Sequence, residues 1–103
     1  MGLRGHFCKQ HIIEYGVAYR MDELESCLDS IERYCDEHLE NHCLLNWYGN
    51  EIVEIHIEDL ESIDTEDLRQ YLSQEQQEIL DSLLEYAKMP QNTKDGFIRI
   101  EFF

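Results

Sequence analysis

Residues 44–57, Leu-Leu-Asn-Trp-Tyr-Gly-Asn-Glu-Ile-Val-Glu-Ile-His-Ile, indicate the fold more directly than any other stretch of the sequence. A short apolar run ends in Trp47 and Tyr48. Gly49-Asn50 follows, and such a pair is a strong signal for the two-residue turn of a β-hairpin. Beyond the turn, isoleucines alternate with Glu and His, which is the period of a half-buried strand. We therefore predict two antiparallel strands joined by a tight turn.

A helix is predicted before this hairpin. Asp22 is a good N-cap, and Glu25 three residues later resembles the second member of a capping box. Apolar residues then recur at spacings of three and four, which indicates an amphipathic helix that extends to about His42. The apolar stripe comprises Leu24, Leu28, Ile31, Cys35 and Leu39. Residues 6–19 lean towards apolar side chains and predict one strand, bent at Gly16.

The second half of the chain predicts helices followed by a strand. We predict about one helical turn in residues 58–63. Thr65 is a candidate N-cap for a separate short helix through Leu72. Ser73 and Gln76 form a second capping-box pattern before an apolar-periodic segment that reaches Ala87. Pro90 prevents that helix from continuing. Residues 92–96 are expected to form a turn, and residues 97–103 the last strand.

The predicted order is therefore β-α-β-β-α-β in one α+β domain that covers residues 1–103. We expect a four-stranded antiparallel sheet with helices on one face, and this order is also that of the ferredoxin-like split βαβ arrangement. A different α+β sheet with an additional N-terminal hairpin is the alternative.

No apolar run approaches the roughly 20 residues that span a bilayer, and the N-terminus has no basic-then-apolar secretion pattern. We therefore expect a cytoplasmic protein with no membrane partner. The four cysteines are expected to be reduced thiols, because disulfides are rare in that compartment.

The charge of the chain is strongly negative and unevenly distributed. The formal net charge is −15, and residues 22–67 alone hold sixteen acidic residues and one basic residue, Arg33. Such a field repels nucleic acid and anionic membranes, whereas it attracts basic proteins and speeds their association. We therefore expect a basic protein partner and no direct contact with nucleic acid.

Acidic residues form a row on the predicted helix at spacings of four, three, four and four. This row is Glu25, Asp29, Glu32, Asp36 and Glu40, and the following segment adds Glu58, Asp59, Glu61 and Asp64. Like charges at these spacings weaken a helix by a few tenths of a kcal/mol each, roughly, and a merely soluble helix would interleave Lys and Arg. We therefore interpret these residues as a binding face for a basic partner. A plain solvated helix face is the alternative.

Cysteine and histidine residues suggest a second, weaker hypothesis. The pairs Cys8–His11 and Cys35–His38 have spacings that zinc uses, although neither is a Cys-x2-Cys pair. Cys35 also lies in the apolar stripe, where cysteine acts as a small hydrophobic residue. No third orienting group accompanies a candidate Cys–His nucleophile. We expect no enzymatic activity and no cofactor, with a Cys/His metal-binding protein as an alternative.

The opening Met1-Gly2-Leu3-Arg4-Gly5, followed by Ile13-Glu14-Tyr15-Gly16, resembles the start of short phage proteins. In size and charge the chain is similar to the small acidic phage inhibitors of bacterial defence, which include anti-CRISPR and DNA-mimicking antirestriction proteins. This resemblance implies an inhibitor that occupies the basic surface of a defence nuclease, such as a CRISPR effector. An immunity protein or antitoxin that neutralises a basic toxin is the alternative with the same electrostatics.

Overall fold

The computed structural model describes residues 4–8, 15–39, 44–49 and 51–102. In chain order its elements are β1 (Arg4–Cys8), β2 (Tyr15–Arg20), α1 (Met21–His38), β3 (Leu45–Tyr48), β4 (Ile52–His56), α2 (Ile57–Glu61), α3 (Thr65–Arg69), α4 (Gln74–Ala87), α5 (Pro90–Asp95) and β5 (Phe97–Phe102).

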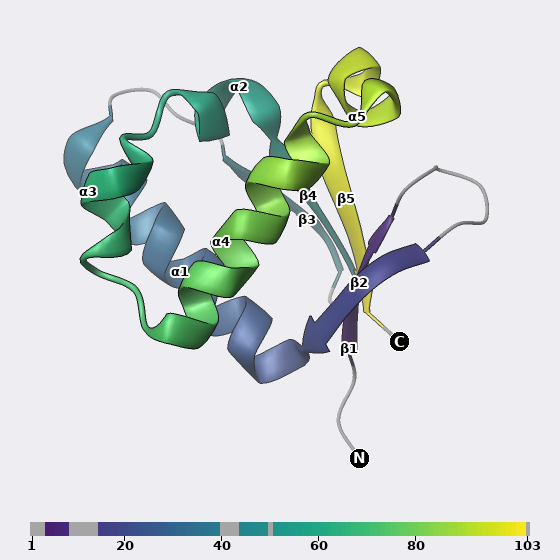
Figure 1. The fold of residues 1–103 in the computed structure, drawn as a ribbon. Helices are drawn as coiled ribbons and strands as arrows, with labels where there is room; N and C mark the ends of the chain where they lie inside the picture. Colours follow the sequence, from purple (N-terminus) through teal and green to yellow (C-terminus); the bar gives the residue numbers. More distant parts are fainter. Residues whose placement is uncertain (1–3, 9–14, 40–43, 50, 103) are drawn as a thin grey trace.

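The strands form one sheet in the order β2-β1-β5-β4-β3, and every neighbouring pair is antiparallel. The helices α1 and α4 lie against one face of this sheet (Figure 1). Burial alternates strictly along β5, where Ile98, Ile100 and Phe102 are buried on the helix-covered face. The predicted α+β class is confirmed. The predicted sheet of four strands is wrong, because the described residues form five.

The additional strand comes from the N-terminal segment, which the sequence predicted as one bent strand over residues 6–19. Two strands form instead, and β1 pairs antiparallel with β2, with Gly5 opposite Tyr19. A single strand of that length would extend ~46 Å, at ~3.3 Å per residue. The longest extent of the molecule is 35 Å, so the chain has to turn back within this segment. The alternative with an N-terminal hairpin is therefore the one that the sheet follows.

The hairpin predicted from residues 44–57 is confirmed as β3 and β4, with Trp47 opposite Val53. Gly49 adopts a left-handed φ of 64°, which a glycine accepts without steric cost. Ile57 was predicted at the end of the second strand but begins α2 instead, and its side chain is buried.

The structure confirms one of the three predicted helix N-caps. Ser73 and Gln76 form the expected capping box at the start of α4. The N-cap of α1 is Arg20 rather than Asp22, whose carboxylate instead accepts bonds from the Arg20 guanidinium and from the next backbone N–H. Asp64, not Thr65, caps α3 by accepting a bond from the backbone N–H of Asp67 at 3.2 Å.

Two further boundaries differ from the prediction. Helix α1 ends at His38, where Leu39 is the C-cap in an extended conformation, earlier than the predicted end near His42. The predicted turn of residues 92–96 overlaps α5, which Pro90 begins at a position that needs no backbone donor. Gly96 closes α5 with a left-handed φ of 85°, which is the usual role of glycine after a helix.

The buried side chains form one cluster between the sheet and the helices. It includes Leu24, Leu28 and Ile31 of α1 together with apolar residues of every other helix except α5 and of β1, β4 and β5. Gly5 lies so close to this cluster that a Cβ atom there would be 2.3 Å from Leu24 Cδ2. No helix among the described residues is both long and apolar enough to cross a membrane.

Candidate functional site

Four of the predicted binding residues lie along one side of α1. Glu25, Asp29, Glu32 and Asp36 fall within an arc of about 60° around the helix axis and span ~16 Å along it. Asp29 and Asp36 are exposed, and Glu25 and Glu32 are half-buried. These four residues are called the acidic flank below. Glu40, the fifth member of the predicted row, lies outside the described residues.

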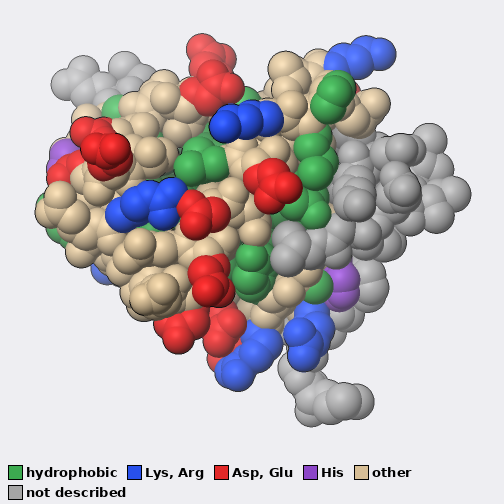
Figure 2. All heavy atoms as spheres, viewed as in Figure 1, with side chains coloured by type: hydrophobic (Ala, Val, Ile, Leu, Met, Phe, Trp, Pro, Cys, Tyr) green, Lys and Arg blue, Asp and Glu red, His purple; other side chains and the backbone are tan. Residues whose placement is uncertain are grey.

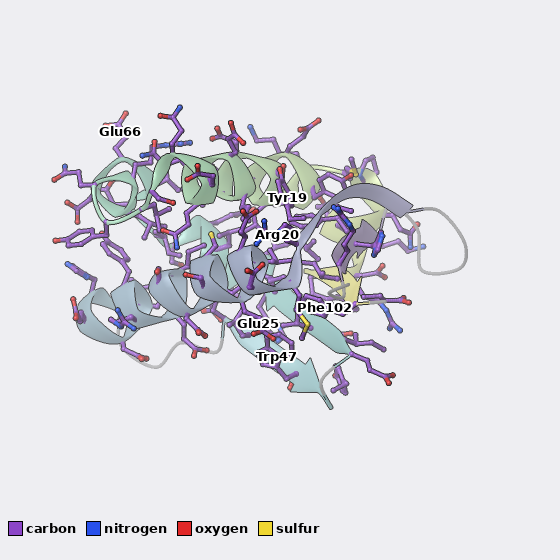
Figure 3. The ribbon with its side chains drawn as sticks, turned by 90° about the horizontal axis from the view of Figure 1, so that it is seen from below. Tyr19, Arg20, Glu25, Trp47, Glu66 and Phe102 are labelled. Carbon is purple, nitrogen blue, oxygen red and sulfur yellow. The ribbon has the colours of Figure 1, made fainter. Side chains whose placement is uncertain are left out.

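The opposite side of α1 is occupied by contacts with α3 and α4. Gln76 Nε2 donates a hydrogen bond to Ser26 Oγ at 3.0 Å, and Tyr34 OH donates one to Asp67 Oδ2 at 2.8 Å. Helix geometry therefore turns the acidic flank away from α4. Figure 3 shows Glu25 on the side of α1 that faces β3, where Trp47 lies. In this view, Glu25 therefore lies on the same side of α1 as Trp47 of β3.

Helix α2 extends the negative charge at the C-terminal end of this flank. The pKa of the buried Cys35 thiol is raised to about 11, first by burial and then by the charges of Asp59, Asp36 and Glu32. Asp59 therefore lies near enough to Cys35 for its charge to act there together with those of Asp36 and Glu32, although Asp59 belongs to a different helix. The structure thus brings one of the predicted α2 residues to the acidic flank.

The other predicted residues of the following segment are placed differently. Glu58 and Glu61 are exposed on α2. Asp64 caps α3, and together with Asp67 it acts on Tyr34, whose pKa is raised to about 12 chiefly by its hydrogen bond to Asp67. Asp64 therefore belongs to the α1–α3 contact rather than to the acidic flank.

Positive charge is distributed unevenly over the surface. Figure 2 shows the face that carries α3 and α4, where Lys and Arg side chains lie among the acidic ones. Arg69 pairs there with Asp81. Within the described ranges, Glu25, Asp29 and Glu32 form no ion pair with Lys or Arg. Arg33 is one helical turn after Asp29 and borders the acidic flank, and it lines a hollow with Tyr34 and Tyr71. Among the described residues, these three members of the acidic flank therefore lack the kind of ion pair that Arg69 and Asp81 form on the face in Figure 2.

Two of the four candidate metal ligands, Cys35 and His38, have described side chains, and these two side chains lie in different surroundings. Cys35 is buried in the core, whereas His38 is exposed, stacks on Tyr34 at 4.0 Å and bonds to its carbonyl oxygen. His11 and the side chain of Cys8 lie outside the described part of the chain. Among the residues that are described, no group of three His, Cys, Asp or Glu side chains could hold a metal ion.

The two buried thiols give a testable pH dependence. Burial raises the pKa of Cys27 from 9.0 to about 12, and that of Cys35 is raised to about 11. Because both folded-state values exceed the unfolded value, the stabilisation is complete below pH 9 and is lost as the pH rises through the folded-state values. We expect the free energy of unfolding to fall above pH 9, by up to about 1.4 kcal/mol per pH unit for Cys27. Urea unfolding from pH 7 to 11 measures it.

The matched control is the Cys27→Ala variant, which is less stable at neutral pH because it leaves a small cavity. Its free energy of unfolding should decline less steeply above pH 9 than that of the unmodified chain. Identical slopes in the two proteins would contradict the assignment of this pH dependence to the Cys27 thiol.

The two aromatic side chains at the end of β3 are exposed to solvent. Trp47 is 38% exposed although one face of its ring stacks on Phe102 at 5.7 Å, and Tyr48 is 51% exposed. The Tyr48 hydroxyl donates a hydrogen bond to Glu54 at 3.1 Å. Sequence reasoning missed that Trp47 lies on the side of the molecule where Glu25 lies, because this arrangement depends on the sheet order.

Comparisons with protein-family models, with curated proteins and with solved structures found no match for this chain. The resemblance of its first residues to phage proteins therefore stays a prediction.

Proposed function

We propose that this chain is an inhibitor protein of a phage or another mobile element, which binds the basic nucleic-acid-binding surface of a bacterial defence nuclease. Binding uses the acidic flank of α1 and the adjoining carboxylate of Asp59. The nuclease is blocked because its Arg and Lys side chains are occupied by protein carboxylates in place of phosphates.

The observation that supports this proposal most is the row of four carboxylates along one side of a helix that is anchored in the core. Successive carboxylates of the acidic flank are ~5–6 Å apart along the axis of α1. Double-stranded DNA has one negative charge per ~1.7 Å of its axis, so the flank imitates part of that charge density and not all of it. A groove that binds DNA through several Arg and Lys residues can still pair with such a row.

Rigidity favours the same function. Helix α1 is anchored by six buried residues, Leu24, Cys27, Leu28, Ile31, Tyr34 and Cys35. A fixed helix presents its carboxylates without the loss of backbone entropy that a disordered acidic tail incurs on binding. The net charge of −15 adds long-range attraction, which raises the association rate at low ionic strength.

The proposal is tested by capture from lysates of bacteria that possess DNA- or RNA-guided defence nucleases. The immobilised chain is washed at about 50 mM and then at about 500 mM salt, because exposed charges more than a few ångströms apart are screened at the higher concentration. We expect a basic nuclease to be retained at low salt and released at high salt.

A control column carries the chain with Glu25, Asp29 and Glu32 replaced by Lys, which should not retain that nuclease. If no nucleic-acid-binding protein is retained on the unmodified chain at low salt, the proposed function is wrong.

A further inference from the structure

Strand β3 is an edge of the sheet that the described residues form, and Glu25 of the acidic flank lies on the same side of the molecule in Figure 3. Strand β3 is last in the sheet order and pairs only with β4 among the described strands. Its residues Asn46, Trp47 and Tyr48 are all exposed. It carries no Lys, Asp, Glu or Pro, although charges and prolines are the usual means by which proteins protect an edge strand from pairing. This edge can therefore accept another strand.

The two faces of the open edge differ in chemistry. Leu45 and Trp47 point to the helix-covered face, because they pair with the buried residues Ile55 and Val53. A strand added beside β3 would direct alternate side chains towards this face, where Glu25 of the acidic flank and the exposed part of Trp47 lie (Figure 3). A Lys or Arg side chain of the added strand that pointed to this face would lie on the side of the Glu25 carboxylate and the Trp47 ring, both of which attract cations.

We infer that β3 and the acidic flank together bind an extended basic segment of the partner by strand addition. Main-chain hydrogen bonds to β3 supply affinity in this mode, and alternate Lys or Arg side chains on the helix-covered face supply specificity. The inference rests on the proposed function, since it names the part of the basic partner that the acidic flank recognises.

A second copy of this chain is the other occupant that an open edge admits. Pairing of β3 with β3 of a second copy would bring two acidic flanks together, and like-charge juxtaposition opposes that contact. The carboxylates that disfavour the dimer are the ones that attract a cationic strand, so charge complementarity favours the basic segment.

The probe is an acetylated and amidated peptide of four Lys-Thr repeats, in which Lys occupies one face of an extended strand and Thr the other. Trp47 is the only tryptophan of the chain, so its fluorescence reports on this site directly. We expect the peptide to bind at about 50 mM salt, to change the Trp47 emission, and to slow hydrogen exchange of amides in β3 but not in β2, the other edge strand.

Two N-methylated forms of the peptide separate strand addition from charge attraction. One form has N-methyl groups on the backbone amides of all Lys residues, and the other has them on those of all Thr residues. Both forms keep the charge of the peptide. The Lys and Thr amides point to opposite edges of an extended strand, so only one of the two sets faces β3. One form should bind about tenfold or more weakly, through loss of about two hydrogen bonds, and the other should bind as the parent does. Replacing Glu25 and Asp29 by Lys should weaken binding of the parent peptide by about tenfold or more at this salt concentration.

Each contrary outcome has a distinct meaning. Equal binding of all three peptides, with loss in the Lys variant, overturns strand addition and leaves the acidic-flank function standing. No binding of any peptide at low salt overturns both. Binding that the Lys variant does not weaken overturns the role of the flank in this site. A dimer of the free protein in sedimentation, with β3 amides already protected, assigns the edge to a second copy and overturns the inference.

Discussion

Replacing Glu25, Asp29 and Glu32 together by Lys should weaken binding of the captured nuclease by about 100-fold at low salt. The variant changes six units of charge at the contact, and exposed charges contribute roughly 0.5 kcal/mol each, so the loss is about 3 kcal/mol. Surface plasmon resonance at about 50 mM salt measures it. Far-UV circular dichroism should be unchanged, because none of the three side chains belongs to the buried cluster.

The matched control replaces Glu75, Glu78 and Glu85 by Lys. All three are exposed on α4, and the change in net charge is identical. Because α4 lies away from the acidic flank, we expect this variant to lose about tenfold or less in affinity, through the weaker overall field alone. Equal losses in the two variants would show that net charge, and not the position of the carboxylates, determines binding.

The Gly5→Ala substitution should destabilise the fold by about 1–3 kcal/mol, the usual cost of overpacking a core. A Cβ atom at this position would be 2.3 Å from Leu24 Cδ2 and 2.7 Å from Phe102 Cε1, well inside contact distance. Leu24 is fully buried and cannot move into solvent. Urea unfolding, followed by circular dichroism, measures the loss.

A double-mutant cycle tests the cause of that loss. Leu24→Ala alone should cost about 2–5 kcal/mol, since it removes a buried side chain. In the double variant the new methyl group fills part of the vacated space, so the combined loss should be smaller than the sum by at least about 0.5 kcal/mol. Strict additivity would mean that contact with Leu24 is not what excludes a side chain at Gly5.

Local chemistry predicted those elements whose signals lie within a few residues of one another. Gly49-Asn50 and the alternation after it identified the hairpin, and Ser73 with Gln76 identified the start of α4. The N-terminal hairpin was predicted only as the alternative, because residues 9–14 contain no glycine or proline to mark a turn. The requirement to turn back arises from the dimensions of the whole molecule, which no local pattern contains.

The acidic flank was predictable in part for the same reason. A spacing of three and four residues places Glu25, Asp29, Glu32 and Asp36 on one side of any helix, so the row itself follows from the sequence. The approach of Asp59 to Cys35 does not follow, because it depends on how α2 packs after the hairpin. The open edge beside the flank depends equally on the sheet order.

Displacement of nucleic acid from the captured nuclease tests the central claim most directly. A labelled DNA or guide RNA bound to the nuclease is titrated with the chain, and its fluorescence anisotropy is followed. We predict that the anisotropy falls to the value of free nucleic acid, and that the variant with Glu25, Asp29 and Glu32 replaced by Lys leaves it unchanged. Nucleic acid that stays bound while the chain saturates the nuclease would contradict the account, because the two could not then share one basic surface.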